Sequence, residues 1–480
     1  MRNKKMKFGY LAKNTFLFTI SSFGTKILTF LVVPLYTSRL STSDFGKVDL
    51  LSTTVSFLIP VLTINIASAV MRFSIDNPIK AGSKFKYGAT LIAVSSLILL
   101  CGLEICYWLK LIPWNGYYYV FLFLLFVFEA YETLFVQFLR GIGKVSVMVV
   151  SSMISTFVRI FLNIVTLVFL NWGVYGYLVS MVTGSACSIL YSSVIIRPFF
   201  VIRNEELSLK DPLYKEMNAY GFMEGINAIG WIIVASLDKY ILTWLEGASE
   251  NGIYSVSYKI PTIITALCAV FTQAWSLSAI REYKKDDEDG FFTKTYEMYN
   301  VGLVICCSIL ILLNIPLSKF MYSNDFFEAW RYTPTLVLAM VFSGLSSFLA
   351  STFTAVKRNG ILAISTFTSA IINAILNFIL IPRIGALGAA IATAISFYLV
   401  YIIRFFGSRR YIKYRVNYIR DSIIYIIIIF QIILAQNATE YWYIQLLIVL
   451  IIIVCYWKTI KYMALGLFSM AESKAKGKEK

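Results

Sequence analysis

Eight ionisable side chains lie inside stretches of sequence that are otherwise apolar, and they are the first candidates for chemistry. An ionisable residue near the centre of a membrane helix costs roughly 2.5–3.5 kcal/mol, so each is a candidate functional residue. Basic side chains in such places can bind an anion such as a diphosphate, because they replace part of its hydration. The eight are the basic residues Lys26, Arg159, Lys239 and Lys259 and the acidic residues Glu129, Glu132, Glu224 and Asp238.

Three of the acidic residues are predicted to couple movement to an ion. Glu129 and Glu132 are three residues apart, so they share a helix face, where two carboxylates can hold a sodium ion or share a proton. Asp238 is adjacent to Lys239, and the two side chains point about 100° apart around a helix. We therefore expect only one of that pair to face a cavity.

Charge neutralisation is an alternative interpretation of the same residues. Each half of the chain contains two of the basic and two of the acidic residues, so simple pairing would leave no net charge. Glu129 and Glu132 would then pair with Lys26 and Arg159. The residue count alone does not predict a cationic cavity.

Two further arginines, Arg72 and Arg281, lie at the predicted inner ends of helices. A cleft open to the cytoplasm would receive a lipid diphosphate at this level, which makes both of them candidate substrate-binding residues. Basic residues are common at cytoplasmic helix ends for reasons of topology, and this is the alternative explanation.

Several kinds of chemistry are excluded by the residues that the chain lacks. It contains no histidine, which excludes Ser-His-Asp and Cys-His catalysis, HExxH zinc sites and histidine-ligated haem. The segment Gly141–Lys144 lacks the spacing of a phosphate-binding loop, so we expect no ATP hydrolysis. The seven cysteines lie in apolar stretches without CxxC spacing. We predict no catalytic residues, no metal site and no cofactor.

The elements that hold these residues are predicted to be membrane helices. Of the 480 residues 58% are hydrophobic and 14% are charged, against about 25% charged in an average soluble domain. About 20 apolar residues span the hydrocarbon of a bilayer, and about fourteen stretches are long enough. The predicted spans are approximately 14–36, 48–70, 88–109, 117–139, 145–170, 174–196, 218–244, 252–280, 296–315, 333–355, 360–381, 386–403, 422–436 and 442–457. The predicted fold is an all-α polytopic membrane protein.

The distribution of basic residues orients these spans. With a cytoplasmic N-terminus, 33 Lys and Arg residues lie on the cytoplasmic side and 6 in the outer loops. This bias predicts that both termini are cytoplasmic. It also explains the net charge of +17 without a nucleic-acid partner. The outer loops are short, which argues against a catalytic domain outside the membrane.

An internal repeat divides the predicted helices. Ser43–Gly46 matches Ser249–Gly252 at an offset of 206, and Gly173–Gly176 matches Gly385–Gly388 at an offset of 212. Six spans per repeat is an even number, so the halves are parallel and related by an axis along the membrane normal. We therefore predict a bundle over 1–196, a cytoplasmic linker over 197–217, a second bundle over 218–403, an extra helix pair over 404–457 and a basic cytoplasmic tail over 458–480.

Small features within the spans suggest kinks and close packing. Pro60 and Pro261 interrupt the backbone hydrogen bonds of spans 2 and 8 at similar depths, and kinks there would let a bundle bend. Gly221 and Gly225 form a GxxxG motif, which indicates close helix packing rather than a ligand site. Aromatic runs such as Trp114–Tyr119 flank the spans and are typical of interfacial belts.

Three features of the sequence point to a known family: twelve plus two spans, the Ser-Asp-Phe-Gly turn at 43–46 and the Gly-Ala-Leu-Gly segment at 385–388. In these features the chain resembles the polysaccharide transport (Wzx-type) branch of the MOP flippase superfamily. The resemblance covers nearly the whole chain. It implies two helical bundles around a central cavity in the bacterial inner membrane. It also implies flipping of undecaprenyl-diphosphate-linked oligosaccharides to the outer leaflet, for O-antigen, capsule or exopolysaccharide assembly. Lipid-linked oligosaccharide, membrane lipids, and polysaccharide polymerase and assembly proteins are the partners that this implies.

Other functions are weighed against this one. A multidrug or cation exporter of the related branch would favour an acidic cavity, whereas the basic residues here are at least as numerous. A membrane polysaccharide polymerase or ligase would need a long outer loop with paired catalytic groups. A scaffold that recruits assembly enzymes would not need buried charges in both halves. A transporter, and not an enzyme, is the predicted function.

Overall fold

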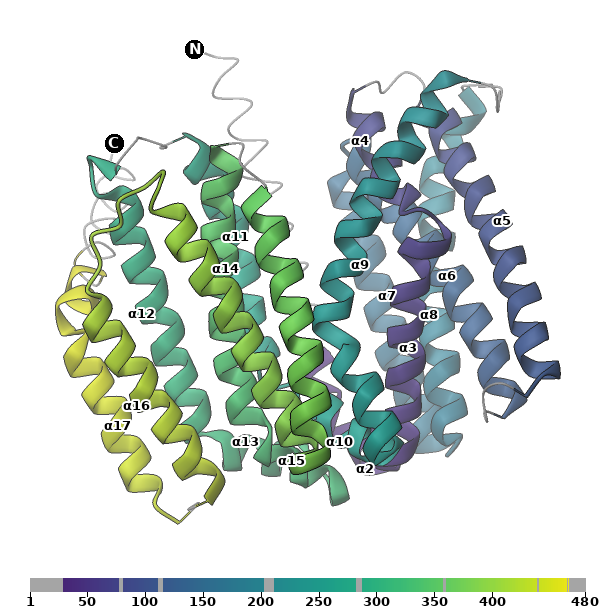
Figure 1. The fold of residues 1–480 in the computed structure, drawn as a ribbon. Helices are drawn as coiled ribbons and strands as arrows, with labels where there is room; N and C mark the ends of the chain where they lie inside the picture. The colour runs from purple at the N-terminus through teal and green to yellow at the C-terminus, as the bar shows by residue number, and fades with distance from the viewer. Residues whose placement is uncertain are drawn as a thin grey trace, which may run out of the picture. The chain divides into compact units, whose positions relative to one another are not determined.

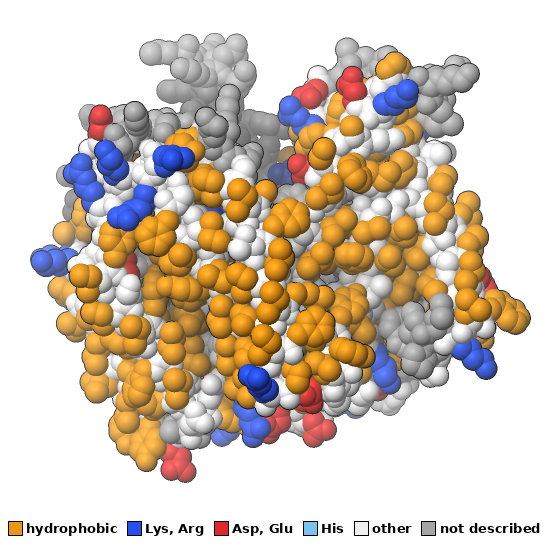
Figure 2. Space-filling view, viewed as in Figure 1, with side chains coloured by type: hydrophobic (Ala, Val, Ile, Leu, Met, Phe, Trp, Pro, Cys, Tyr) orange, Lys and Arg blue, Asp and Glu red, His pale blue; other side chains and the backbone are white. Residues whose placement is uncertain are grey.

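The computed structural model describes residues 29–76, 81–110, 115–202, 211–281, 287–356, 360–437, 440–463 and 465. Within these ranges the regular structure is helical throughout, and the predicted all-α polytopic membrane fold is confirmed. In Figure 2 apolar side chains cover most of the middle of the visible face, whereas charged side chains gather towards the helix ends. Such an apolar surface is what a lipid-facing protein presents.

The predicted spans are recovered with two qualifications. Among the described residues, nine helices are long and apolar enough to cross a membrane, and twelve if each bent pair of helices is one span. One of the nine, α15 (Gly360–Ser408), contains two predicted spans, because its backbone leaves the helical conformation at Ile384 and Gly385. The first predicted span, 14–36, lies mostly outside the described residues.

The chain divides into two compact units, Met1–Ser255 and Val256–Lys480. Figure 1 shows their helices. The helices of unit 1 are α2 (Val33–Arg39), α3 (Thr42–Leu62), α4 (Ile66–Asp76), α5 (Ala81–Trp108), α6 (Gly116–Gly141), α7 (Val145–Ile164) with a π-helical turn (Val165–Phe169), α8 (Gly173–Ile202), α9 (Pro212–Glu246) and α10 (Ala248–Ser257), which begins here and ends in unit 2. The helices of unit 2 are α11 (Thr262–Arg281), α12 (Phe291–Leu312), α13 (Asn314–Met321), a 3₁₀ helix (Asn324–Arg331), α14 (Thr333–Ala355), α15, α16 (Tyr418–Asn437) and α17 (Trp442–Cys455).

The units divide the chain after the start of the predicted second bundle, because α9 packs against α3 and α4 in unit 1. The two glycines of the GxxxG motif face this contact. A Cβ at Gly221 would lie 2.5 Å from the Ile64 carbonyl oxygen, and one at Gly225 would lie 3.5 Å from the Pro60 carbonyl oxygen. The motif therefore serves close packing, as predicted. The predicted bundle boundaries, which follow the sequence repeat, stay a prediction.

Both proline-containing spans are broken near their prolines. Pro60 lies two residues before the end of α3, and Ile64 and Asn65 adopt left-handed φ angles of 51° and 47° before α4 begins. In the equivalent span, Pro261 lies in the break between α10 and α11. Left-handed backbone is unfavourable for a β-branched residue such as Ile64, so the packing of α9 on this break helps to hold it in place.

The first sequence repeat produces a close helix crossing within unit 1. A Cβ at Gly46 of α3 would overlap the Ala248 carbonyl oxygen, and a Cβ at Gly252 of α10 would overlap the Thr42 carbonyl oxygen. The two contacts are equivalent, since Thr42 and Ala248 are also 206 residues apart. A hydrogen bond of 2.7 Å between the Thr42 and Ser249 hydroxyls and one of 3.1 Å from Asn251 Nδ2 to the Gly46 carbonyl oxygen join the helices. We call this contact the glycine crossing.

The second repeat produces a matching turn in each unit. Gly173 has a φ of 54° and Gly385 a φ of 57°, a left-handed conformation that glycine adopts without steric cost. The glycine three residues later packs closely in both cases. A Cβ at Gly176 would lie 2.6 Å from Thr166 Cβ, and one at Gly388 would lie 2.6 Å from the Leu380 carbonyl oxygen. Equivalent glycines thus make equivalent turns.

In unit 2, buried hydrogen bonds fasten the extra helix pair to α12. Gln431 of α16 bonds Ser308, with its Nε2 3.0 Å from the Ser308 carbonyl oxygen. The Tyr425 hydroxyl donates to Asn300 Oδ1 at 2.8 Å, and Asn300 Nδ2 donates to the Tyr456 hydroxyl at 3.3 Å. Figure 1 shows α16 and α17 beside α12. Polar bonds inside an apolar unit fix the register of the helices that they join.

Candidate functional site

Three of the predicted site residues meet in unit 1. Arg159 of α7 donates through Nη2 to Glu132 Oε2 of α6 at 3.2 Å and to Ser185 Oγ of α8 at 2.7 Å. Ser185 in turn donates to Glu132 Oε2 at 2.6 Å. The Arg159 and Glu132 side chains are 31% and 16% exposed, so the ion pair is mostly buried but still partly accessible. The pairing of Arg159 with a glutamate agrees with the neutralisation alternative for this residue.

A glycine makes room for the arginine. Gly184 of α8 lies directly under the Arg159 side chain, and a Cβ there would overlap Arg159 Cγ and lie 3.0 Å from its Nε. The same Cβ would lie 2.9 Å from the Ser155 carbonyl oxygen of α7. The dipeptide Gly184-Ser185 therefore supplies both the space for the guanidinium and one of its acceptors.

This cluster opens into a cavity of about 520 Å³, which we call the arginine cavity. Its volume falls in the range of about 300–1,000 Å³ that is usual for small-molecule sites. Among the described residues, Arg159 Nε and Gln137 Oε1 are buried without a hydrogen-bond partner. Glu129 also lines the cavity, and the described residues give it no ion pair. The lining residues are Ser56, Ile59, Glu129, Glu132, Thr133, Val136, Gln137, Ser152 and Arg159.

The unpartnered atoms make the arginine cavity a candidate site for a polar ligand. A buried polar atom without a partner costs about 1–3 kcal/mol, so such atoms are retained where something else satisfies them. The cavity carries one guanidinium and two carboxylates, and with all three ionised its net charge is negative. An anion would therefore meet Arg159 most favourably when Glu129 is neutralised by a proton or a cation.

A second cavity, of about 370 Å³, lies between α3 and α9, and Ser56 lines both cavities. We call it the tryptophan cavity. The two segments of α9 on either side of Val234, Pro212–Ile233 and Ala235–Glu246, are bent by 48° relative to each other. The tryptophan cavity faces this bend and has no charged lining residue. Its lining residues are Ser52, Thr53, Ser56, Trp231, Ile232, Ala235 and Ser236.

The adjacent residues Asp238 and Lys239 have separate partners. Lys239 Nζ lies 2.9 Å from Asp49 Oδ2 of α3, which also accepts a hydrogen bond of 2.7 Å from Ser255 Oγ. Asp238 is buried and accepts a hydrogen bond of 2.6 Å from the Tyr254 hydroxyl. The side chains therefore point to different helices, as their angular separation predicts. Together these bonds join α3, α9 and α10 beside the glycine crossing.

None of the other predicted site residues whose side chains the structure describes lines the arginine cavity. Lys26 lies outside the described residues. Arg72 forms an exposed ion pair with Asp76 at 3.6 Å, which is the kind of surface pair that contributes little. Lys259 lies half-buried in the break between α10 and α11, in unit 2. Arg281 is the last residue of α11, and its side chain lies outside the description.

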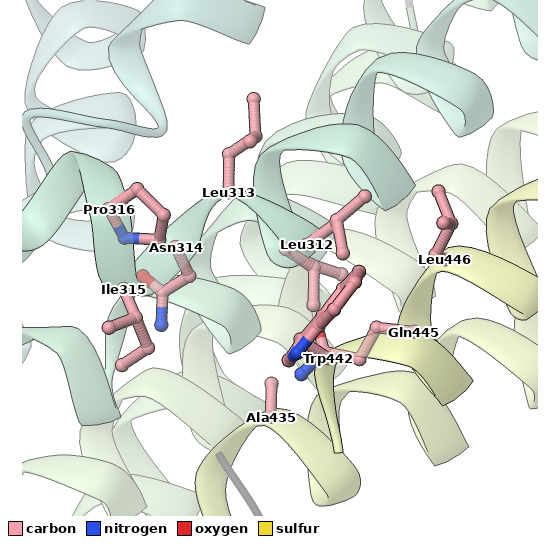
Figure 3. A pocket seen from close by; sticks show the side chains of 10 residues that line it. Leu312, Leu313, Asn314, Ile315, Pro316, Ala435, Trp442, Gln445 and Leu446 are labelled. Atoms are coloured by element: carbon pink, nitrogen blue, oxygen red, sulfur yellow. The ribbon is translucent and has the colours of Figure 1, made fainter. Parts of the chain in front are cut away.

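Unit 2 contains a separate apolar pocket of about 420 Å³ at the ends of α12, α16 and α17. Figure 3 shows its lining, to which Leu312 and Asn314 contribute together with Trp442 and Gln445. None of the predicted site residues lines it, and its surface is largely apolar. It lacks the charged groups that line the arginine cavity.

Several residues of the site were missed by sequence reasoning. Gly184, Ser185 and Gln137 carry no charge and follow no motif, so nothing local marks them. Asp49 is the partner of Lys239 across 190 residues of sequence. Arg404, which lies just beyond the predicted span 386–403, is buried in α15 and donates to Ser365, Thr366 and the Ser346 carbonyl oxygen.

Comparison with known proteins adds to this description. Residues 11–276 match the model of a family described as "Polysaccharide biosynthesis protein". The chain is 23% identical over 252 residues to the "Probable low-salt glycan biosynthesis flippase" of Haloferax volcanii, covering 48% of this chain and 50% of that protein. It is 22% identical over 230 residues to an uncharacterized membrane protein of Methanocaldococcus jannaschii, covering 45% and 43%. The matches thus span about half the length of these relatives.

The fold is also similar to solved structures. A lipid II flippase MurJ in an inward closed conformation matches with a TM-score of 0.66 and 16% identity, over 94% of this chain and 99% of that chain. An inward-facing multidrug resistance MATE family transporter of the MOP superfamily matches with a TM-score of 0.65 and 12% identity, over 83% and 95%. At these identities the likeness establishes a shared fold.

Proposed function

This chain belongs to the polysaccharide biosynthesis protein family, and on that premise we propose that it is a flippase for lipid-linked oligosaccharides. It would carry undecaprenyl-diphosphate-linked repeat units from the cytoplasmic to the outer leaflet of the bacterial inner membrane, for assembly of O-antigen, capsule or exopolysaccharide. The distribution of basic residues supports cytoplasmic termini. The glycan flippase among its relatives and the MurJ-like fold support this class of cargo.

The observation that carries the proposal is the arginine cavity. Hydrocarbon rejects a bare diphosphate, so a flippase needs a polar site inside its apolar bundle. The guanidinium of Arg159 lines the cavity, where its Nη2 is held by Glu132 and Ser185. Its Nε is buried without a hydrogen-bond partner among the described residues. The held nitrogen fixes the plane of the group, and Nε can then donate to a phosphate oxygen.

Glu129 gives this site a means of ion coupling. An ionised Glu129 repels an incoming diphosphate, whereas a protonated or sodium-bound Glu129 does not. Binding of the anion and binding of the cation therefore favour each other, and this coupling is reciprocal. In this mechanism Glu132 positions Arg159, and Glu129 carries the coupling ion. The mechanism needs no covalent step, so the protein acts as a transporter.

The first test follows lipid-linked repeat units in a strain that lacks the gene. We expect them to accumulate on the cytoplasmic leaflet and to be cleared by the wild-type protein but not by Arg159→Gln. Lys26→Ala is expected to behave like Arg159→Gln. The matched control is Arg331→Gln, since Arg331 is more than half exposed and pairs with Glu328. Accumulation on the outer leaflet would instead indicate a polymerase or ligase.

Cation export is a second candidate, and the excess of carboxylates in the arginine cavity favours it. Glu129 would then bind the cargo itself. Such a protein would protect cells from cationic dyes, and Glu129→Gln would remove that protection while Arg159→Gln would not. Dye resistance with normal surface polysaccharide in the deletion strain would replace the flippase proposal by this one.

A further inference from the structure

The tryptophan cavity differs in chemistry from the arginine cavity beside it. Its lining has one indole, two aliphatic side chains and four hydroxyls, and no charged group. The arginine cavity suits a charged group, so one ligand that occupied both would be charged at one end and neutral at the other. Ser56 lines both cavities and marks where the two ends would join.

The hydroxyls of α3 present hydrogen-bond acceptors to the tryptophan cavity. Ser52 Oγ donates to the Val48 carbonyl oxygen at 2.9 Å, and Ser56 Oγ donates to the Ser52 carbonyl oxygen at 2.9 Å. Because each proton is used within the helix, the oxygen lone pairs remain for a donor from outside. A sugar hydroxyl is such a donor.

Two further hydroxyls of the tryptophan cavity have no hydrogen bond to any residue that the structure describes. Thr53 is a residue only 9% exposed, and it lines the cavity. Ser236 of α9 lies half-buried on the opposite wall. A buried hydroxyl is stabilised when a ligand completes its hydrogen bonds, which an alkyl chain cannot do.

The apolar part of the cavity lining also suits a sugar ring. Trp231 and Ile232 lie just before the bend of α9, and Ala235 lies just after it. A pyranose ring has an apolar face of C–H groups and a rim of hydroxyls, so one face suits an indole and the rim suits Ser and Thr. Sites for small molecules commonly combine an aromatic wall with a few polar groups that fix orientation.

Building on the proposed function, we infer that the tryptophan cavity binds a sugar ring of the lipid-linked oligosaccharide while Arg159 binds its diphosphate. Trp231 stacks on the ring, and Ser52, Thr53 and Ser236 bond its hydroxyls. The cavity therefore makes the protein prefer a diphosphate lipid that carries sugar over one that carries none.

Binding to the purified full-length protein in lipid nanodiscs tests this inference. The probes are undecaprenyl diphosphate without sugar and undecaprenyl diphosphate bearing glucose, galactose, N-acetylglucosamine or N-acetylgalactosamine. We expect the wild-type protein to bind at least one sugar-bearing probe more tightly than the sugar-free probe. Trp231→Ala should weaken that binding about tenfold and leave binding of the sugar-free probe unchanged.

Two further variants separate stacking from hydrogen bonding and from loss of fold. Ser236→Ala should weaken only the sugar-bearing probe, by about threefold to tenfold. The matched control is Trp244→Ala, since Trp244 lies on the same helix and is 75% exposed, so both probes should bind it as they bind the wild type.

The outcomes distinguish the inference from the function on which it rests. Equal affinity of the wild type for all probes, or equal weakening of both kinds of probe by Trp231→Ala, overturns the sugar site and leaves the diphosphate carrier intact. Failure of the wild type to bind any of the probes overturns the sugar site and the proposed cargo together.

Discussion

The glycine crossing gives a prediction whose size follows from the backbone distances. In Gly46→Ala the new Cβ would overlap the Ala248 carbonyl oxygen and lie 2.9 Å from the Gly252 nitrogen, whereas ordinary contact begins at 3.4 Å. The helices α3 and α10 must therefore move apart by at least about 0.5 Å along that line. Such overpacking costs about 1–3 kcal/mol.

The movement also weakens the two hydrogen bonds of the crossing. The Thr42–Ser249 bond and the Asn251–Gly46 bond contribute about 1 kcal/mol each. The substitution is then expected to weaken the contact between α3 and α10 by about 2–4 kcal/mol. Gly252→Ala should have the same effect, because its Cβ would overlap the Thr42 carbonyl oxygen.

Disulfide formation between Thr42→Cys and Ser249→Cys measures the contact. The native hydroxyl oxygens are 2.7 Å apart, which places the two Cβ atoms in reach of a disulfide. We expect rapid cross-linking in the wild-type background and at least a tenfold slower reaction with Gly46→Ala or Gly252→Ala. Gly102→Ala is the control, since a Cβ there would meet nothing within 4 Å. An unchanged rate with Gly46→Ala would refute the close crossing.

Three further predictions concern the arginine cavity and the repeat. Gly184→Ala should displace the Arg159 side chain and abolish clearance of lipid-linked repeat units at normal protein abundance. The control Gly230→Ala, whose Cβ meets nothing within 4 Å, should keep clearance. Full activity of Gly184→Ala would contradict the role of that glycine. The rate of transport of lipid-linked repeat units into vesicles should rise as the pH falls, because a protonated Glu129 no longer repels the diphosphate. Glu129→Gln should lose this pH dependence. If Glu129→Gln kept the wild-type pH profile, the coupling ion would be carried by another residue. Gly173→Ala and Gly385→Ala should each lower the free energy of unfolding by about 1–2 kcal/mol, because alanine disfavours a positive φ. Denaturant titration measures this change. A loss of stability at only one of the two positions would show that the turns are not equivalent.

The sequence predicts those features of the fold that depend on composition and on local pattern. Apolar length predicted the helices, and the repeated glycines at 46 and 252 and at 173 and 385 predicted equivalent local structure, because a glycine's role is set by the backbone. The GxxxG contact followed from the same logic. The break of the second span at Ile64 and Asn65 was indicated by Pro60 only approximately, since proline disturbs a helix over a full turn.

The partners of the buried charges were much harder to predict. Lys239 pairs with Asp49, which lies near the start of a helix and was not counted among the intramembrane charges. Arg404 lies just beyond the predicted span 386–403, yet it is buried in α15, where two hydroxyls and a carbonyl oxygen accept its hydrogen bonds. Trp231 could not be distinguished from interfacial aromatics. Each of these depends on which helix faces are neighbours, and that is decided by tertiary packing rather than by spacing along the chain.

The glycine crossing has a consequence for how the two matching segments of the chain can change. At this point α3 and α10 touch through main-chain atoms, which are the same whatever side chains surround them. Each of the two segments can therefore acquire different pockets and charges elsewhere, provided that both keep a glycine at this contact.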